Sequence, residues 1–195
     1  MDKSEIIRRS QLVPGTKSRP DYAELLYKVA KRLPNNSRIL EIGGMIGGSA
    51  SVFALTIKDR GGLIYSIDPG FWSKQEQLQN YASIRDVVLG DLYKFLKNLI
   101  LTEAEGYIIP LPGTSKEVFA RWKGKIFFDL VFIDGLHTYE GVKIDMQWLE
   151  YVKQGGLCLF DDWLEGIKKA CDEYMVLHPE WKRISSDPHI FQKKK

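Results

Sequence analysis

The chain has 195 residues, 44% of them hydrophobic and 27% charged, and its formal net charge at pH 7 is +3. This length and composition predict one globular domain over residues 1–195. The sequence shows no stripe of basic residues, which argues against a nucleic-acid partner, and the run Lys193–Lys195 is interpreted as a solvated tail. The N-terminus lacks the apolar core of a secretory signal, and no stretch has the roughly 18 apolar residues of a membrane helix. The two cysteines, Cys158 and Cys171, make no disulfide framework. We therefore expect a cytoplasmic protein.

Five short apolar segments are expected to be strands of a buried sheet. Each is bounded by glycine, proline or charged residues. They are apolar on both faces rather than alternating, which is typical of parallel strands covered by helices on both sides. The five segments are Arg38–Gly43, Leu63–Asp68, Tyr107–Leu111, Leu130–Asp134 and Gly156–Asp161.

The segments between these strands carry apolar residues at helical spacing. Alternating strands and helices predict a doubly wound α/β domain with right-handed crossovers. The first helix is expected to use Asp21 as its cap, directly after Pro20. The expected helices are Asp21–Arg32, Gly48–Lys58, Leu92–Leu101, Ser115–Trp122, Tyr139–Val152 and Ile167–Leu177.

Three further segments complete the chain. Two short candidate strands, Trp181–Ser185 and His189–Gln192, flank a turn, and such a hairpin would make the sheet mixed. The N-terminal segment, residues 1–20, is irregular and is interpreted as a lid. Residues 70–90 are long for their place and are expected to form an extra helix or an insertion covering the site. Substrate specificity would come from these two irregular segments.

The turn after the first expected strand, EIGGMIGGSA, is rich in glycine but does not fit a dinucleotide fingerprint. G-x-G-x-x-G fails from Gly43, because the third position is Met45, and it fails from Gly44 as well. Glu41 would repel a pyrophosphate but suits a cationic amino group. Asp68, which lies 25 residues after Gly43, is placed to accept ribose hydroxyls. An amino acid joined to a nucleoside, S-adenosylmethionine, fits both acids; the alternative is a plain turn whose acids face helix dipoles.

These motifs resemble those of the class I S-adenosylmethionine-dependent methyltransferases, over most of the chain from Asp21 onward. ILEIGGMIGGSA looks like the family's first motif, IYSIDPG like its second, and LPGTSKEVF like the loop that meets adenine. The resemblance implies a single Rossmann-like methyltransferase domain with a seven-stranded mixed sheet, whose last strand is antiparallel, and helices on both faces. It implies these cofactor-binding residues: Glu41, Gly43, Gly44, Gly47, Ser49, Asp68, Gly113, Thr114, Ser115 and Asp134.

A narrower resemblance is to metal-dependent O-methyltransferases of the catechol and macrocin types. In that group an Asp ends the fourth strand and an acidic pair ends the fifth, and the matching residues here are Asp134, Asp161 and Asp162. The resemblance implies that these three hold Mg2+ and that the substrate is a small hydroxylated molecule. FIDGLHTYEG resembles the macrocin branch, which places a histidine where His137 stands. Related enzymes often form dimers or larger assemblies.

Chemistry supports these roles, although other interpretations of the same residues stay open. A metal-bound hydroxyl loses its proton readily, and His137 can accept a proton near neutral pH, so His137 and Asp134 are the candidate catalytic residues. Alternatively, His137 binds substrate or makes a structural hydrogen bond, Asp134 caps the next helix or contacts the cofactor, and the pair Asp161–Asp162 starts a helix. Asp145 is expected to be solvated or salt-bridged, with a site role as the alternative.

The sequence therefore predicts an O-methyltransferase that uses S-adenosylmethionine, assisted by magnesium. His178 and His189 are expected to lie away from its site. The alternatives are a metal-independent methyltransferase acting on nitrogen or on a macromolecule, a nucleoside-binding protein without catalysis, and a nicotinamide-dependent oxidoreductase. Glu41 and Met45 argue against the last of these.

Overall fold

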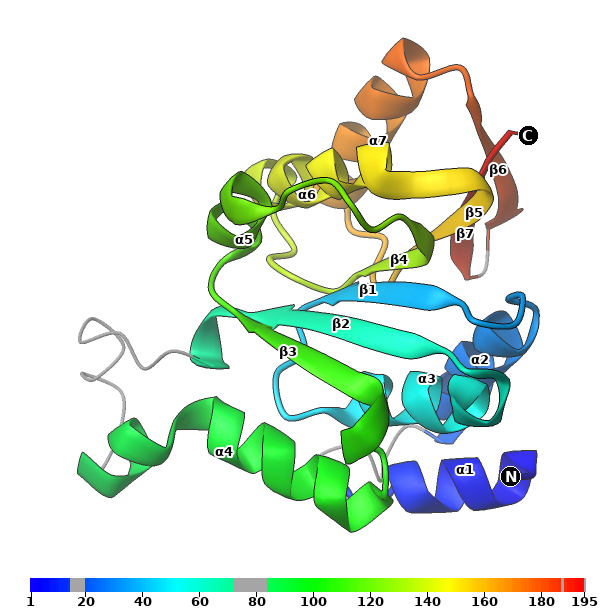
Figure 1. Ribbon diagram of the computed structural model, residues 1–195. Coiled ribbons are helices and arrows are strands. Elements are labelled where there is room, and N and C mark those ends of the chain that lie inside the picture. The colour runs from blue at the N-terminus through cyan, green and yellow to red at the C-terminus, as the bar shows by residue number, and fades with distance from the viewer. Residues whose placement is uncertain (15–19, 72–83, 187, 195) are drawn as a thin grey trace.

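The computed structural model describes residues 1–14, 20–71, 84–186 and 188–194, and it contains one seven-stranded sheet (Figure 1). The strand order is β3-β2-β1-β4-β5-β7-β6. The first five strands are parallel, and β7 is antiparallel to both β5 and β6. The strands are β1 Arg38–Ile42, β2 Leu63–Asp68, β3 Ile108–Pro112, β4 Phe128–Ile133, β5 Val152–Phe160, β6 Trp181–Ser186 and β7 His189–Lys193. The predicted mixed, doubly wound sheet with an antiparallel last strand is confirmed.

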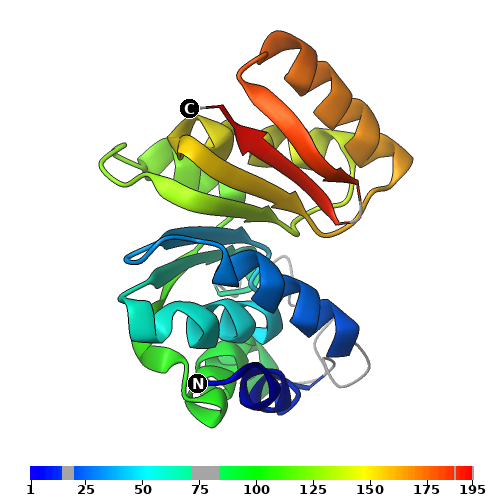
Figure 2. The same ribbon diagram turned by 90° about the vertical axis from the view of Figure 1, so that its right-hand side faces the viewer.

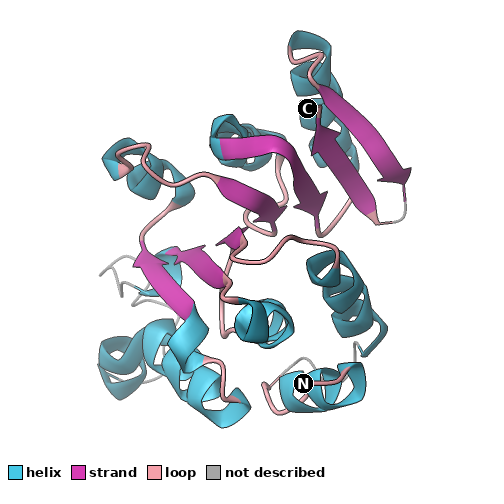
Figure 3. Cartoon of the chain, turned by 45° about the vertical axis from the view of Figure 1, so that its right-hand side comes forward, coloured by secondary structure: helices cyan, strands magenta, loops and turns pink. Residues whose placement is uncertain are grey.

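Helices cover both faces of this sheet (Figure 3). The layer below the sheet in Figure 1 contains α1 to α4, and the layer above it contains α5 to α7. The α-helices are α1 Lys3–Ser10, α2 Pro20–Lys31, α3 Gly48–Ile57, α4 Ile84–Thr102, α5 Ser115–Arg121, α6 Tyr139–Asp145 and α7 Glu165–Leu177. Short 3-10 helices are η1 Lys58–Arg60, η2 Pro69–Phe71, η4 Glu105–Tyr107 and η5 Met146–Tyr151. No described helix is both long enough and apolar enough to cross a bilayer.

Several helix boundaries differ from the prediction. Asp21 is not a cap, because α2 already begins at Pro20, whose fixed φ suits a first helical turn. The helix expected over Tyr139–Val152 ends at Asp145 and continues as the 3-10 turn η5. Of the segment 70–90, the described residues belong to η2 and to the start of α4, and residues 72–83 lie outside the described part.

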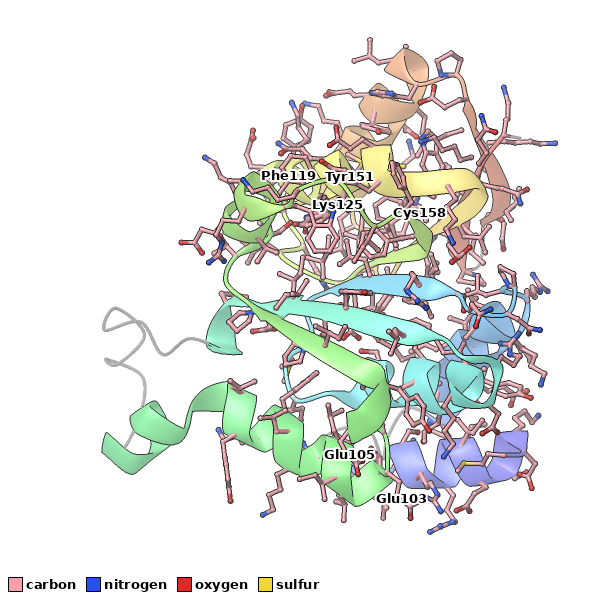
Figure 4. All side chains as sticks on the ribbon, viewed as in Figure 1. Glu103, Glu105, Phe119, Lys125, Tyr151 and Cys158 are labelled. Carbon is pink, nitrogen blue, oxygen red and sulfur yellow. The ribbon has the colours of Figure 1, made fainter. Side chains whose placement is uncertain are left out.

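The N-terminal segment contains a helix that the sequence analysis missed. Asp2 caps α1 by accepting the Glu5 N–H at 2.9 Å. Arg9 of α1 pairs with Glu103, just beyond the end of α4, and Figures 2 and 4 show the first helix lying along this layer. A helix of eight residues is too short to be recognised from periodicity, because it completes only about two turns.

Each face of the sheet has its own hydrophobic core. On the α1–α4 side, Phe53 packs edge-on against Phe132 with ring centroids 5.4 Å apart. On the other side, Trp148 is fully buried and packs against Phe119, which Figure 4 shows beside Tyr151. Truncating a buried aromatic of this kind to alanine typically costs about 3–5 kcal/mol.

Two expectations about single residues in this region can be compared with the structure. Cys158 and Cys171 are both buried and carry free thiols, which agrees with the expectation that they make no disulfide framework. The expectation that Lys193–Lys195 form a solvated tail is wrong for Lys193. Lys193 belongs to β7, and its ammonium donates to the carbonyl of Val152 at 3.0 Å.

Candidate functional site

A cavity of about 830 Å3 lies at the carboxyl ends of β1, β2 and β4. Cavities of this size and place are where open α/β sheets bind ligands. The predicted site residues that line it are Gly43, Gly44, Ser49, Asp68, Thr114, Ser115, Asp134 and His137. The predicted residues outside the described lining are Glu41, Gly47, Gly113, Asp161 and Asp162. Ser10 and Pro14 also line the cavity, so the N-terminal segment borders it.

The glycine turn after β1 packs the backbones of three strands together. Gly43 and Gly44 donate their N–H groups to the carbonyl of Ile67 at 2.9 and 3.2 Å. Gly43 has a φ of +99°, and a Cβ there would lie 1.9 Å from the carbonyl oxygen of Asp134, so only glycine fits. Gly47, in the left-handed region, caps the start of α3. The turn thereby fixes the position of Asp134 relative to β1.

Asp68 is held at the edge of the cavity by backbone donors. Its Oδ2 accepts the N–H of Met45 and its Oδ1 accepts the N–H of Gly70, both at 2.7 Å. A carboxylate has about four acceptor sites, so Asp68 can accept a ligand hydroxyl as well. The backbone donors orient it before any ligand arrives.

Glu41 lies beneath the cavity and has no solvent exposure. Its two oxygens accept the hydroxyls of Ser49 and Ser66, each at 2.5 Å. Burial raises the pKa of Glu41 to about 7, although the two serine hydrogen bonds lower it, and the nearby Asp68 charge adds to the rise. Because Ser49 lines the cavity, Glu41 is connected to it through this hydroxyl.

The loop after β3 joins the site to α5. Gly113 donates its N–H to the carbonyl of Asp68 at 3.2 Å. Thr114 forms a capping box with Glu117, whose backbone N–H donates to Thr114 Oγ1 at 3.2 Å while Glu117 Oε2 accepts the Thr114 N–H at 2.9 Å. The hydroxyl of Ser115 accepts the indole N–H of Trp148 at 3.0 Å. The loop is therefore rigidly anchored beside Asp68.

Two acids and a histidine meet where β4 and β5 end. Asp134, His137 and Asp161 each offer one ligand atom, and these atoms lie within 4.8 Å of one another. Burial, together with the nearby Asp161 carboxylate, raises the pKa of Asp134 to about 9. Asp161 Oδ1 is buried and has no hydrogen-bond partner within the described part of the chain. Hard carboxylate oxygens placed in this way fit a divalent cation such as Mg2+.

Asp162 contacts this cluster through His137. Its Oδ2 lies 2.7 Å from His137 Nδ1, while His137 Nε2 lies 3.3 Å from Asp134 Oδ1. The closer carboxylate, at Nδ1, favours the tautomer that donates from that nitrogen, and Nε2 can then accept from the Asp134 carboxyl, whose raised pKa keeps it protonated. The structure thus brings all four predicted residues together, with His137 rather than Asp162 as the third group of the cluster.

The structural alternatives for these acids are wrong. Thr138, not Asp134, caps α6, because its side chain accepts the N–H of Gly141. Helix α7 begins at Glu165, so the pair Asp161–Asp162 does not start it. Asp134 and the pair Asp161–Asp162 are therefore not used as helix caps, and their carboxyl groups can bind a cation or contact other groups of the site.

Asp145 lies nearer to the site than expected. Asp145 is not solvated: it is 4% exposed and lines the cavity. The signal was in the sequence, because Asp145 falls on the same buried helical stripe as Val142 and Trp148. His189 stacks on Trp163 with centroids 4.0 Å apart and is not among the residues that line the cavity.

Comparison with known proteins gives one family and many similar folds. The family model described as a methyltransferase domain matches residues 40–163. The O-methyltransferase TomG of Streptomyces achromogenes, solved with S-adenosylmethionine, is 13% identical with a TM-score of 0.67, covering 100% of this chain and 92% of that one. An O-methyltransferase from Bacillus cereus, solved with S-adenosylhomocysteine, is 15% identical with a TM-score of 0.66 and the same coverage. At such identities these likenesses establish the fold.

Proposed function

We propose that this chain, which belongs to the methyltransferase domain family and is a class I S-adenosylmethionine-dependent methyltransferase, methylates a hydroxyl group of a small molecule with the help of Mg2+. The observation that carries the proposal is the meeting of Asp134, Asp161 and His137 beside the cavity that Asp68 borders. The free, buried cysteines fit the reducing cytoplasm that we also propose.

The cavity residues fit the cofactor part by part. Asp68, oriented by two backbone N–H groups, is proposed to accept the ribose hydroxyls. Glu41 is proposed to lie below the cofactor's amino group and to act through Ser49, which it holds at 2.5 Å, and the positive charge of that group would favour the ionised form of Glu41. The loop of Gly113, Thr114 and Ser115 is proposed to border the adenine. Bound in this way, S-adenosylmethionine supplies a methyl group whose bond to sulfur breaks as its bond to the acceptor oxygen forms.

The acidic cluster is proposed to hold the cation and to prepare the acceptor. Asp134 and Asp161 would be ligands, and Mg2+ would lower the pKa of an acceptor hydroxyl and orient it. His137 then takes the hydroxyl proton on Nε2, and Asp162 stabilises the protonated ring through Nδ1. Asp162 is therefore a positioning residue for the base in this arrangement, and an outer contact of the metal site.

Calorimetry with S-adenosylhomocysteine tests the cofactor assignment. Binding to the wild type is expected, and Asp68→Ala should weaken it roughly 10-fold or more, because hydrogen bonds to a charged group are lost. Asp172→Asn, an exposed position on α7, serves as the control and should bind like the wild type. Absence of heat from the wild type at millimolar ligand would remove the cofactor assignment.

A second measurement tests the acceptor and the metal. Catechols, sugars and other small molecules with paired hydroxyls are supplied with labelled cofactor, with and without Mg2+. Methylation of an oxygen that is lost in EDTA and restored by Mg2+ is expected. Full activity in EDTA would instead favour the metal-independent alternative, and methylation confined to nitrogen or to a macromolecule would contradict the proposed acceptor.

A further inference from the structure

The acidic pair lies in a short loop that makes few backbone hydrogen bonds. Residues 161–164 join β5 to α7. The N–H of Asp161 donates to the end of β4 at 3.1 Å, and the carbonyl of Leu164 accepts the first backbone bond of α7 at 2.9 Å. Within the described part of the chain, no backbone–backbone hydrogen bond holds Asp162 or Trp163 between these two points. The position of this part of the loop therefore depends on its side chains.

The side chain of Trp163 is held by the C-terminal hairpin of β6 and β7. His189 of β7 stacks on the indole, with ring centroids 4.0 Å apart and an angle of 8° between the ring planes. The guanidinium of Arg183, on β6, lies 4.9 Å from the centroid of the indole. Phe160 and Phe191 also contact the indole, with centroids 5.8 and 6.0 Å away. Aromatic stacking and a cation beside an aromatic ring are both favourable, so these contacts fix the indole.

Arg183 also holds His189 in the orientation that the stack requires. An arginine side chain only donates hydrogen bonds, so its Nη2 donates to Nδ1 of His189, at 2.5 Å. The Nε of Arg183 donates to the carbonyl of Ser185 at 3.3 Å, which ties the guanidinium to its own strand. The side chains of Arg183, His189 and Trp163 are therefore one connected unit, which we call the hairpin stack.

The hairpin stack is directly joined to the acids of the site. Asp162 precedes Trp163 in the loop, and its Oδ2 lies 2.7 Å from Nδ1 of His137. Asp161, which belongs to the acidic cluster, precedes Asp162. A movement of the indole would carry the loop backbone with it, because no backbone hydrogen bond described above holds the loop at these two positions. The stack thus sets where both carboxylates lie, although its members are not among the described residues that line the cavity.

We propose that the hairpin stack positions the acidic pair, which makes Trp163 and His189 positioning residues for the cation and for the base His137. The inference rests on the proposed function, in which Asp161 binds Mg2+ and Asp162 stabilises the protonated base. Groups that orient the ligands of a metal site without binding the metal change its affinity or the activity by roughly 10- to 100-fold when they are substituted. The C-terminal hairpin then serves the site as well as the sheet.

Substitution of His189 tests the inference against a matched control. His189→Ala removes the stacked ring and should weaken the binding of Mg2+ alone, measured by calorimetry, roughly 10-fold and lower kcat by at least as much. Binding of S-adenosylhomocysteine should stay within about 2-fold of the wild type, because His189 does not line the cavity. His178→Ala removes another histidine that stacks on an aromatic ring, that of Tyr174, with centroids 3.9 Å apart. This control should leave both the Mg2+ affinity and kcat unchanged.

A conservative variant separates positioning from other roles of the imidazole. His189→Phe keeps a ring on Trp163 and should restore most of the Mg2+ affinity and of kcat. Losses that His189→Phe does not restore would contradict the inference, and so would equal behaviour of His189→Ala and His178→Ala. Absence of Mg2+ binding by the wild type would instead overturn the proposed function, and kcat of the same variants would then decide the inference.

A second variant keeps the test decisive if His189→Ala does not fold, as judged by circular dichroism. Arg183→Gln changes an exposed side chain and removes the guanidinium that contacts both rings of the stack. It should weaken Mg2+ binding and lower kcat in the same direction as His189→Ala. A loss of less than about 3-fold in both quantities would overturn the inference.

Discussion

At the scale of single residues, the site concentrates acids that burial keeps from ionising freely. Glu41 has a pKa raised to about 7 and Asp145 one raised to about 6, in both cases mainly by burial. Perturbed acids that gather around one cavity are typical of functional sites. Such residues destabilise the folded chain when they ionise, so their function is obtained at the expense of stability.

Glu41→Gln should flatten the pH dependence of stability. The folded protein holds the Glu41 proton up to about pH 7, whereas the unfolded chain releases it near its ordinary value of 4.5. The free energy of unfolding therefore falls as pH rises through this window, by up to about 3 kcal/mol from this residue. Denaturant titrations at pH 4.5 and 7 measure the difference. An equal change in the free energy of unfolding between pH 4.5 and 7 for wild type and variant would contradict this prediction. Asp172→Asn is the control.

His137→Gln should lower the rate of methyl transfer by roughly 100- to 10,000-fold, because the variant lacks a base at the acceptor. Binding of S-adenosylhomocysteine should stay within about 2-fold of the wild type, since His137 is not proposed to hold the cofactor. His178→Gln removes a histidine that stacks on Tyr174 and should leave the rate unchanged. A variant that regains full rate at higher Mg2+ would make His137 a metal ligand rather than the base.

At the scale of elements, the sequence predicts the strands better than the helix ends. β2 has the predicted bounds Leu63–Asp68, because the apolar run that the sheet buries is also what the sequence displays. The end of α6 at Asp145 could not be predicted, because apolar spacing continues through Trp148 while the backbone tightens into a 3-10 turn.

The candidate site was predictable in its residue types but not in its contacts. That acids follow β4 and β5 is visible in the sequence, and parallel strands bring such ends to one edge. Which carboxylate oxygen faces His137 depends on side-chain torsions that no pattern in the sequence specifies. The insertion of Asp162 at His137 Nδ1 is of this kind.

The turn between β1 and α3 gives a prediction at this scale. Gly43→Ala should destabilise the protein by roughly 2–5 kcal/mol, because alanine is strained at a φ of +99° and its Cβ would meet the Asp134 carbonyl oxygen. Gly106→Ala is the matched control, since a Cβ there meets nothing within 4 Å. Chemical denaturation of both variants decides. Equal stability of the two would show that the β1 and β4 ends are not packed as described.

At the scale of the whole molecule, the site joins parts of the chain that are distant in sequence. Asp68 comes from β2, Asp134 follows β4 and Asp161 follows β5. The parallel sheet brings these strand ends to one edge, where Asp68 and Asp134 line the cavity and Asp161 lies beside Asp134. A ligand that contacts these ends should therefore stabilise the fold as a unit, because binding to the native state alone shifts the unfolding equilibrium.

The variant Asp161→Asn should separate two effects of the acidic cluster on the stability of the fold, namely the electrostatic cost of the neighbouring acids and the stabilisation by bound Mg2+. Without metal, the Asp161 charge adds to the cost of ionising the partly buried Asp134, so replacing Asp161 by a neutral amide should stabilise the protein by about 1–3 kcal/mol. With Mg2+ the order should reverse. The wild type should gain about 2.7 kcal/mol at a metal concentration 100 times its Kd, whereas the variant, lacking a ligand, should gain little.

Thermal unfolding in EDTA and in Mg2+, for wild type, Asp161→Asn and the exposed control Asp172→Asn, measures both effects in one experiment. The control should follow the wild type under both conditions, because it is on the outer face of α7 and pairs only with Lys168 in the structure described. Equal gains from Mg2+ in all three proteins would exclude Asp161 as a ligand. If Asp161→Asn is less stable than the wild type in EDTA, Asp134 and Asp161 do not destabilise each other electrostatically. The crossing of the two stabilities is the specific outcome, since a purely structural role for Asp161 would lower stability under both conditions.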